Sequence, residues 1–350
     1  MSGPRPLVPG GSGLAQLRAT PALLADAGDD TVVCGAVPFD VAEPGALRVG
    51  TAEFRNVGAI PVARARTAPL LAGSRPVPEP ARYRAAVAEA LRRIETGALA
   101  KVVLARSLEL TALSPWSVPQ LAGELSARNP MATTVAVPVD DPVDPAARWL
   151  VGASPELLLR RRGPSVSLRP LAGSIPRSAD PAEDARRGEQ LLGSDKDRRE
   201  HAVVVEAILE ALRPFCRQIN APEPELHATP ALWHLATPVT GLLIDREVTS
   251  THLVAALHPT PAVGGTPRSE ALSVIREIEG LDRGCYAGAV GWQDGDGDGE
   301  WVVAVRCGEV SGRRLRIFAG AGIVAGSDPA AELAETGVKM RTMLDALSSR

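Results

Sequence analysis

The sequence predicts an α+β protein that folds as a single large domain, with large and mostly antiparallel sheets flanked by helices. Three observations predict it. Strand-like and helix-like apolar runs are intermingled without a strict strand–helix–strand rhythm, which favours antiparallel over parallel sheet. The 350 residues are 45% hydrophobic and 23% charged, as in ordinary globular proteins. No repeat at a solenoid period divides the chain.

The first part of the chain, residues 1–78, is expected to be a strand-rich part of this fold. It is rich in Gly, Pro and Ala, and residues 31–34 form a short β-like run. We interpret it as strands and turns, and the proline-rich residues 76–80 as a linker.

Apolar spacing predicts the elements that follow. Tyr83, Val87, Leu91 and Ile94 recur at helical spacing, and Gly97 can end that helix. Further along, the pattern predicts a strand over 101–110, a helix over 118–127, and a strand, a turn and a strand over 148–160.

The most helical part of the chain is residues 181–216. Ser194 and Asp197 resemble a capping box that starts a helix, and Pro214 should end it. Two apolar strands are predicted late in the chain, at 301–307 and 314–319. A last helix follows Pro329, and its predicted apolar side consists of Leu333, Val338, Met340, Leu344 and Leu347.

Charge and composition exclude several classes of partner. The net charge of −3 and the 3% of aromatic residues argue against nucleic-acid binding. No run of about 18 apolar residues predicts a membrane span, and the first residues lack a secretion signal. The four cysteines form no CxxC pair, which fits a reducing cytoplasm. We expect a small-molecule substrate, and a monomer because no coiled-coil or long apolar stripe is evident.

Two residues, Lys101 and Glu156, could move protons. Lys101 shares a strand face with Val103 and Ala105, where loss of hydration favours the neutral amine that a general base requires. Alternatively, this lysine begins the strand and reaches water. Glu156 lies in a tight turn, where it is either a buried, protonated carboxyl or a solvated side chain.

Carboxylates on two predicted helices could hold a cation. Glu200 shares a helical stripe with Val204 and Ile208, so it needs a partner, either a metal or Lys196 one turn earlier. Three charged residues of the last helix, Glu332, Glu335 and Lys339, share one face. Their carboxylates could join Glu200 around magnesium, or Glu335 and Lys339 could form a surface ion pair.

Two glycine-rich motifs lack the context of the sites that they resemble. Residues 320–326 have the spacing GxGxxxG instead of GxGxxG, and only 24 residues follow them, too few for a dinucleotide-binding half. Residues 294–300 lack the twelfth-position glutamate of a calcium loop and are better interpreted as a hairpin turn. The sequence contains neither a P-loop nor a GxSxG motif.

Nine strings, in order, resemble those of the chorismate-utilising enzymes, a family that includes isochorismate, anthranilate and salicylate synthases. They are KVVLAR (101–106), GASPELLLR (152–160), PLAGSIPR (170–177), SDKDRREH (194–201), LWHLATPV (232–239), HPTPAVGG (258–265), GEWVVAVRC (299–307), FAGAGIV (318–324) and AETGVKM (334–340). The resemblance implies this family's fold and a chorismate-binding catalytic region in residues 79–350. The first 75 or so residues match only loosely.

The resemblance also implies roles for single residues. Lys101 matches the base that activates water for attack on carbon 2 of chorismate, and Glu156 matches the acid that protonates the departing 4-hydroxyl. Glu200 and Glu335 match magnesium ligands, and Glu332 lies where a carboxylate helps through water.

Six further positions match groups that bind the substrate. Arg306 and Lys339 match cationic groups that bind substrate carboxylate, a task suited to the fork of arginine and the point charge of lysine. The positions that match the lining of the pocket are Gly173, Ser174, His234 and Gly320.

Within the family the likeness is greatest to isochorismate synthases of siderophore biosynthesis, which implies a magnesium-dependent isomerase. Anthranilate synthases typically lack a lysine at the place of Lys101, and aminodeoxychorismate synthases often have one where this chain has Ala172. A salicylate synthase, which also eliminates pyruvate, is the alternative. An inert relative that only binds a metabolite, or an oxidoreductase that binds nicotinamide, would belong to other classes. Two departures from the family are Asp195, in place of Glu, and the long segment 139–148, predicted as a surface hairpin.

Overall fold

The fold is that of a computed structural model, which describes residues 5–7, 11–25, 27–28, 30–51, 68–140 and 147–348. These residues form one domain with three sheets and eight helices. Every strand pair in the described ranges is antiparallel. The prediction of large, mostly antiparallel sheets flanked by helices is therefore confirmed.

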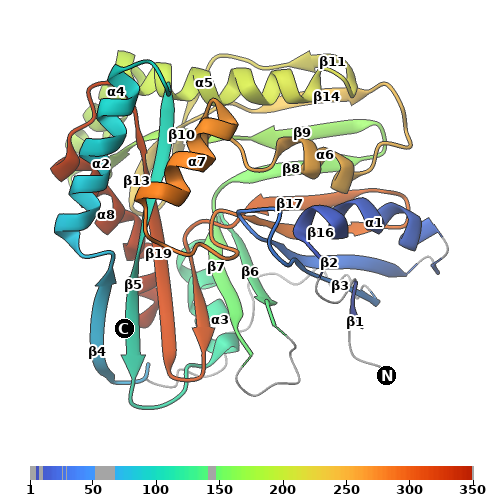
Figure 1. Cartoon of the computed structure of the whole chain (residues 1–350), viewed down its shortest axis with the longest axis horizontal. Helices are drawn as coiled ribbons and strands as arrows, with labels where there is room; N and C mark the ends of the chain where they lie inside the picture. Colours follow the sequence, from blue (N-terminus) through green and yellow to red (C-terminus); the bar gives the residue numbers. More distant parts are fainter. Residues whose placement is uncertain are drawn as a thin grey trace.

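The largest sheet has nine strands, which run across the right half of Figure 1. In order across the sheet they are β1 (Arg5–Pro6), β3 (Ala46–Thr51), β2 (Thr31–Val37), β16 (Ala289–Asp294), β17 (Gly299–Val303), β8 (Leu157–Arg162), β9 (Ser165–Arg169), β14 (Val239–Leu243) and β11 (Cys216–Asn220). Helices α1 (Gly13–Ala25) and α6 (Ser250–Leu257) contact each other over this sheet, α1 on β2 and α6 on β8 and β17.

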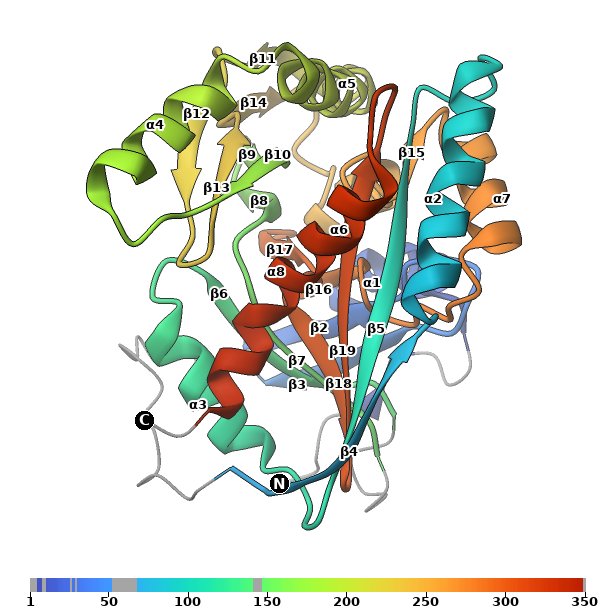
Figure 2. The same cartoon turned by 90° about the vertical axis from the view of Figure 1, so that its left-hand side faces the viewer.

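The second sheet has seven strands, which run vertically in Figure 1 and cross the direction of the first sheet. They are β15 (Gly265–Thr266), β5 (Lys101–Ala112), β19 (Arg314–Ile323), β18 (Cys307–Ser311), β7 (Trp149–Ser154) and β6 (Thr133–Pro138) in order, with β4 (Leu71–Val77) also paired to β5. Helix α8 (Pro329–Leu347) lies along β19, between α2 (Pro80–Glu95) and α3 (Val118–Arg128), as Figure 2 shows.

A small third sheet consists of β10 (Leu171–Pro176), β13 (Leu232–Ala236) and β12 (Glu225–Ala228). Helices α4 (Pro181–Leu192) and α5 (Asp195–Leu212) pack against it. The remaining helix, α7 (Arg268–Ile278), packs against β5 beside α2, as Figure 2 shows. The small sheet and α5 thus lie across from α8 and β19 (Figure 2).

Local sequence explains where the long helices begin. Ser194 caps α5 by accepting a hydrogen bond from the Asp197 amide, as the predicted capping box required. Asp328 caps α8 by accepting from the amides of Ala330 and Ala331, and a proline occupies the first turn. Helix α2 buries Tyr83 and Val87, on the predicted apolar face.

The interpretation of the first 80 residues as strands and turns was wrong about α1. This helix contains Pro21, which breaks the usual helical pattern, and it is anchored by tertiary contacts. The buried Gln16 side chain donates to Gly45 O at 3.0 Å and accepts from Leu47 N at 2.9 Å. Residues 76–80 are also not a linker, because β4 includes Pro76 and α2 begins at Pro80.

The apolar run 301–307 is not one strand, as its sequence predicts, but parts of two. Strand β17 ends at Val303 in the nine-stranded sheet, and β18 begins at Cys307 in the seven-stranded sheet. Arg306 between them has a φ of 54°, a left-handed conformation that ends strand geometry. Likewise, Gly320 and Gly322 lie inside β19 instead of after it. The turn at 294–300 does join two paired strands, as predicted.

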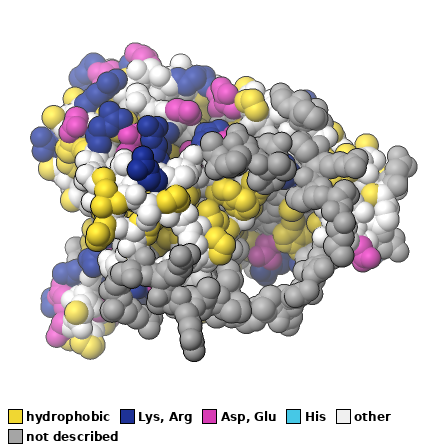
Figure 3. Space-filling view, turned by 90° about the horizontal axis from the view of Figure 1, so that it is seen from below, with side chains coloured by type: hydrophobic (Ala, Val, Ile, Leu, Met, Phe, Trp, Pro, Cys, Tyr) yellow, Lys and Arg dark blue, Asp and Glu magenta, His cyan; other side chains and the backbone are white. Residues whose placement is uncertain are grey.

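Other expectations concern the surface and the last helix. Helix α8 buries Met340, as expected, but its buried side otherwise consists of Glu332, Thr336, Met343 and Ala346. Most of the predicted hairpin at 139–148 lies outside the described residues. Figure 3 shows charged and apolar side chains mixed over one face of the molecule. Within the described ranges, none of the helices has the length and apolar character needed to cross a bilayer.

Candidate active site

Two neighbouring passages of the chain between the large sheets position the centre of the site. At the first, Pro155 and Glu156 join β7 to β8, and at the second, residues 304–306 join β17 to β18. The passages are bonded to one another. The amide of Val303 donates to Glu156 O, and the amide of Ala153 donates to Arg306 O, each at 3.1 Å. These backbone bonds fix the positions of the Cα atoms from which the side chains of Glu156 and Arg306 extend.

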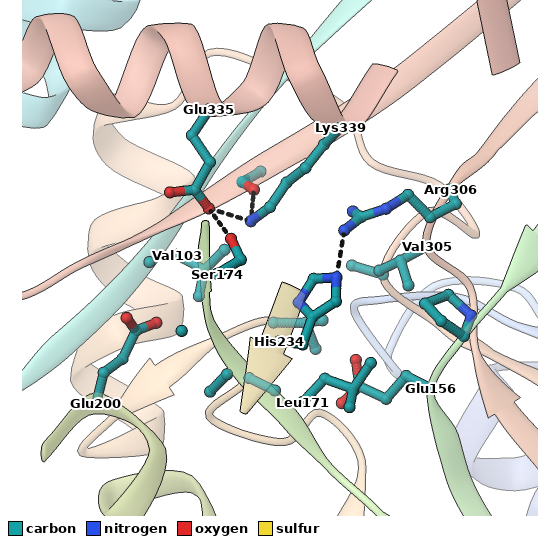
Figure 4. Close-up of a pocket in the computed structure, with 18 of the residues that line it drawn as sticks. Val103, Glu156, Leu171, Ser174, Glu200, His234, Val305, Arg306, Glu335 and Lys339 are labelled. Carbon is teal, nitrogen blue, oxygen red and sulfur yellow. Dashed lines mark hydrogen bonds and ion pairs between the residues drawn. The ribbon is translucent and has the colours of Figure 1, made fainter. Parts of the chain in front are cut away.

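A cavity of about 200 Å³ opens beside these passages. Nine of the eleven residues that the sequence analysis singles out line it: Glu156, Gly173, Ser174, Glu200, His234, Arg306, Gly320, Glu335 and Lys339. Figure 4 shows Glu200 and Glu156 on opposite sides of the cavity, with Glu335 and Lys339 reaching in from α8. Strands of the seven-stranded and three-stranded sheets and two helices therefore contribute to one site.

Lys101 lies just beneath the wall of this cavity. Its side chain is 1% exposed, and its Nζ lies 2.9 Å from Glu200 Oε1. Glu200 therefore pairs with Lys101 and not with Lys196 on its own helix, one of the two partners that the sequence suggests. A Cβ on Gly322 would collide with Glu200 Oε1 and lie 3.0 Å from Lys101 Cε, so only glycine leaves room for this pair.

Glu156 occupies the end of the cavity at the sheet crossings. Burial raises the pKa of its carboxyl to about 7, although a backbone hydrogen bond at Leu171 and the charge of Lys101 act in the opposite direction. Such a carboxyl is partly protonated at neutral pH, which is the state that a proton donor needs. Of the two alternatives that the sequence leaves open for this turn, the structure shows the buried carboxyl.

Arg306 and His234 lie next to one another at the same end. Burial holds the pKa of His234 well below its usual range, with further lowering by the charge of Arg306. The imidazole is therefore neutral, and its Nε2 can accept from Arg306 Nη2, 3.4 Å away. Burial also lowers the pKa of Arg306, but arginine stays charged at any physiological pH.

The α8 side of the cavity carries a hydrogen-bonded cluster. Lys339 forms an ion pair with Glu335 and donates to Gly320 O at 3.0 Å. Ser174 Oγ donates to the same Glu335 carboxylate at 3.2 Å. Burial alone would raise the pKa of Glu335, but Lys339 and Ser174 lower it below the usual value. Glu335 therefore keeps its negative charge, and this pair faces the cavity instead of the surface.

Glu332, one turn before Glu335, is 3% exposed and lies outside the lining of the cavity. Its carboxylate is 3.7 Å from the Nζ of Lys196, a lining residue. Burial, and then the negative charge of Glu335, raise the pKa of Glu332 to about 7. This crowding of negative charge is the kind of environment that a divalent cation would relieve.

The donor chemistry fits magnesium. Among the described residues, no three acidic, His or Cys side chains are already arranged around a metal position. Glu200 and Glu335 are held by lysines, and both face the cavity. Magnesium is commonly bound by one or two carboxylates together with water and substrate oxygens, so these two ligands suffice.

Several lining residues were not singled out from the sequence. Tyr286 stacks on Phe318 with ring centroids 4.9 Å apart, and its side chain reaches the cavity beside Gly320. Its only signal was that it is one of two tyrosines in the chain. Ala262 and Val263 also line the cavity, within the recognised string HPTPAVGG, but short apolar side chains carry no chemical signal.

Comparison with known proteins settles the family. Residues 61–348 match the protein family described as chorismate binding enzyme. The chain belongs to this family. The match includes every site residue predicted from the sequence.

Named members of the family are similar over most of the chain. Isochorismate synthase DhbC of Bacillus subtilis is 48% identical over 321 residues, 90% of this chain and 80% of that protein. The vibriobactin-specific isochorismate synthase of Vibrio cholerae is 43% identical over 270 residues, 77% and 67% of the two chains. The crystal structure of DhbC from Bacillus anthracis, 41% identical, superimposes with a TM-score of 0.86 over 96% of this chain and 90% of its own.

Proposed function

We propose that this chorismate-binding enzyme is an isochorismate synthase, which isomerises chorismate to isochorismate. The observation that carries the proposal is the arrangement of one cavity. A buried carboxyl with a pKa of about 7 lies at one end, and a buried lysine paired to a carboxylate lies behind the opposite wall. The names of the relatives support the same reaction.

The reaction replaces the hydroxyl at carbon 4 of the ring with one at carbon 2, and the two conjugated ring double bonds each shift by one position. It therefore needs an acid where the hydroxyl leaves and a base where water attacks. Glu156 donates its proton to the departing 4-hydroxyl, which leaves as water. Its raised pKa keeps part of the enzyme in the required protonated form at neutral pH.

Lys101 acts as the base. It takes a proton from the water whose oxygen bonds to carbon 2, so one water enters and one leaves, and the net change is an isomerisation. Its side chain is 1% exposed, and the Glu200 carboxylate, 2.9 Å from Nζ, fixes the position of the nitrogen behind the cavity wall. Reprotonation of Glu156 and deprotonation of Lys101 complete the cycle.

The substrate carries two carboxylates, and the cavity holds two cations for them. Arg306 offers a planar fork of donors, and Lys339 offers a point charge held in place by Gly320 O. Neutral His234 orients the guanidinium through its Nε2. The short residues Gly173, Ser174 and Gly320 let the ring approach the backbone closely.

Magnesium is the proposed cofactor, with Glu200 and Glu335 as ligands and Glu332 contributing through water. When bound, the ion supplies a positive charge that holds the ring carboxylate of the substrate. The support for it is the donor set and the crowding of carboxylates that raises the pKa of Glu332.

We further propose that the enzyme works in the cytoplasm as a monomer and that its product feeds a siderophore or a related aromatic metabolite. The free cysteines fit a reducing compartment, and the vibriobactin-specific relative supports the pathway class. Light scattering of the purified protein would test the monomer, since a larger mass would contradict it.

A product assay tests the function. The purified protein is incubated with chorismate, with and without magnesium, and the products are separated by chromatography and assayed for pyruvate. We expect isochorismate without pyruvate, lost on chelation and lost in Lys101→Ala. Salicylate with pyruvate would establish the salicylate synthase instead. No conversion, or full turnover by Lys101→Ala, would refute the mechanism.

A further inference from the structure

A buried ion pair lies behind the cavity wall, on residues that the proposed chemistry does not use. Glu279 follows α7, Arg283 comes four residues later, and their side chains are 1% and 3% exposed. Arg283 Nε donates to Glu279 Oε1 at 2.7 Å, and its Nη2 donates to Oε2 at 2.5 Å. The guanidinium also lies 4.0 Å from the centroid of the Phe39 ring. The bidentate pair and the ring together fix the plane of the guanidinium.

The remaining donors of Arg283 reach two separate segments of the cavity wall. Its Nη1 donates to Val263 O and its Nη2 donates to Val103 O, each at 2.8 Å. Both valines line the cavity, Val103 from β5 and Val263 from the loop before β15. The same two segments are joined by the amide of Val103, which donates to Gly264 O at 2.8 Å.

Two more bonds extend this connection along the wall. The amide of Tyr286, whose ring lines the cavity, donates to Arg283 O at 2.9 Å. The amide of Ala105 donates to Glu279 Oε2 at 2.8 Å, directly opposite Gly320 in the sheet register. The side chains of this ion pair thus bond to β5 at two places and to the loop at Val263, and the backbone of Arg283 begins the turn that carries Tyr286.

We propose that the Glu279–Arg283 pair is a positioning device that holds β5 and the loop at Val263 in their catalytic arrangement. The proposal rests on the proposed function, because β5 carries the base Lys101. Neither group proposed to bind substrate carboxylates is bonded to the pair itself, because Arg306 lies in the β17–β18 passage and Lys339 extends from α8 to Gly320 O. Disturbing the pair should therefore lower kcat with little change in KM.

The variant Arg283→Lys tests this, because lysine keeps the charge beside Glu279 but has one nitrogen in place of the fork. We expect kcat to fall by at least roughly tenfold and KM to stay within about threefold, since displacements of about 1 Å can cost a hundredfold in rate. Thermal unfolding of each variant is measured in parallel.

Arg161→Lys is the matched control. Arg161 on β8 is also 3% exposed, pairs with Asp298, and donates to the carbonyls of Asp296 and Arg246. It does not line the cavity. The control should lose a similar amount of thermal stability and keep kcat within about twofold, because its bonds hold turns away from the reacting atoms.

The outcomes separate the possibilities. A kcat in Arg283→Lys no lower than in the control, or a rise in KM alone, would overturn the positioning role. If Arg283→Lys does not fold, Glu279→Gln decides by the same comparison, because the amide weakens the hold on Arg283 and Ala105. A wild-type enzyme that converts no chorismate refutes the proposed function itself, whereas an active wild type with unaffected variants refutes only the positioning role.

Discussion

Glu156 and Arg306 occupy the two neighbouring passages between the large sheets, and the carbonyl of each accepts a hydrogen bond from the strand that leads to the other. The acid and the cationic group are therefore fixed relative to one another by backbone. The charge of Arg306 lowers the pKa of Glu156, but less than burial raises it. The result is a carboxyl that exchanges its proton near neutral pH.

The first prediction is a pH dependence. Because Glu156 must be protonated to act and its pKa is about 7, kcat/KM should fall as the pH rises through about 7, approaching tenfold per unit above it. A steady-state profile measures this. Glu332→Gln is the control, since that carboxyl also has a pKa of about 7 but is not the proton donor, so the alkaline limb should persist. A profile that stays level to about pH 8 would contradict the assignment.

Glu156→Gln should abolish most of the activity without unfolding the protein. The amide has the same shape and keeps the backbone bond from Val303, but it cannot donate the proton. Loss of a general acid typically costs roughly 10²- to 10⁴-fold, so kcat should fall by that factor. Turnover and thermal unfolding are measured together. A variant within tenfold of wild-type kcat would mean that another group protonates the leaving hydroxyl.

Variants of the Lys101–Glu200 pair should show that its effect on the free energy of unfolding is distinct from its effect on turnover. Glu200→Gln leaves the ammonium of Lys101 buried without a counter-charge, and removing one partner of such a pair costs about 3–5 kcal/mol in free energy of unfolding. The double variant Lys101→Met with Glu200→Leu should recover most of that loss, because apolar residues can replace a buried pair. It should have no turnover. Urea unfolding without magnesium provides the measurement. Equal free energies of unfolding for the wild type, Glu200→Gln and the double variant would contradict a buried Lys101–Glu200 ion pair.

Magnesium should stabilise the folded protein even without substrate. A ligand that binds only the folded state at about 100 times its Kd adds about 2.7 kcal/mol. The midpoint of thermal unfolding should therefore rise with magnesium and return on chelation. The rise should be lost in Glu335→Gln, which keeps the size of the ligand but not its charge. An equal rise in wild type and variant would place the cation elsewhere.

Gly322→Ala tests whether close packing at Gly322 is needed to hold the Lys101–Glu200 pair. The added methyl would collide with Glu200 Oε1, and Gly322 cannot move aside because β19 is paired to β5 at this position. We expect Glu200 to be displaced from Lys101, with loss of turnover. Gly73→Ala is the control, since a Cβ there meets nothing within 4 Å. Equal kcat in the two variants would show that the wall can adjust.

Much of the local structure was decided by the sequence alone. The cap at Ser194, the buried stripe from Glu200 to Leu212 and the strand face of Lys101 follow from spacing, because helices and strands have fixed periods. Short strings of residues in a fixed order also identified the family and nine of the residues that line the cavity. These patterns depend on residues close together in the chain, so they can be recognised without knowing any tertiary contact.

Only the tertiary structure decided what lies between distant segments. The run 301–307 has the alternation of one strand, and nothing within it indicates that the chain changes sheets at Arg306. Helix α1, with Pro21 inside it, is held by the contacts of Gln16 with β3. The partner of Glu200 proved to be Lys101 on another element. Arg283 donates hydrogen bonds to the carbonyls of Val263 and Val103, on two other segments of the chain. Such pairings depend on packing between segments, which residue spacing does not encode.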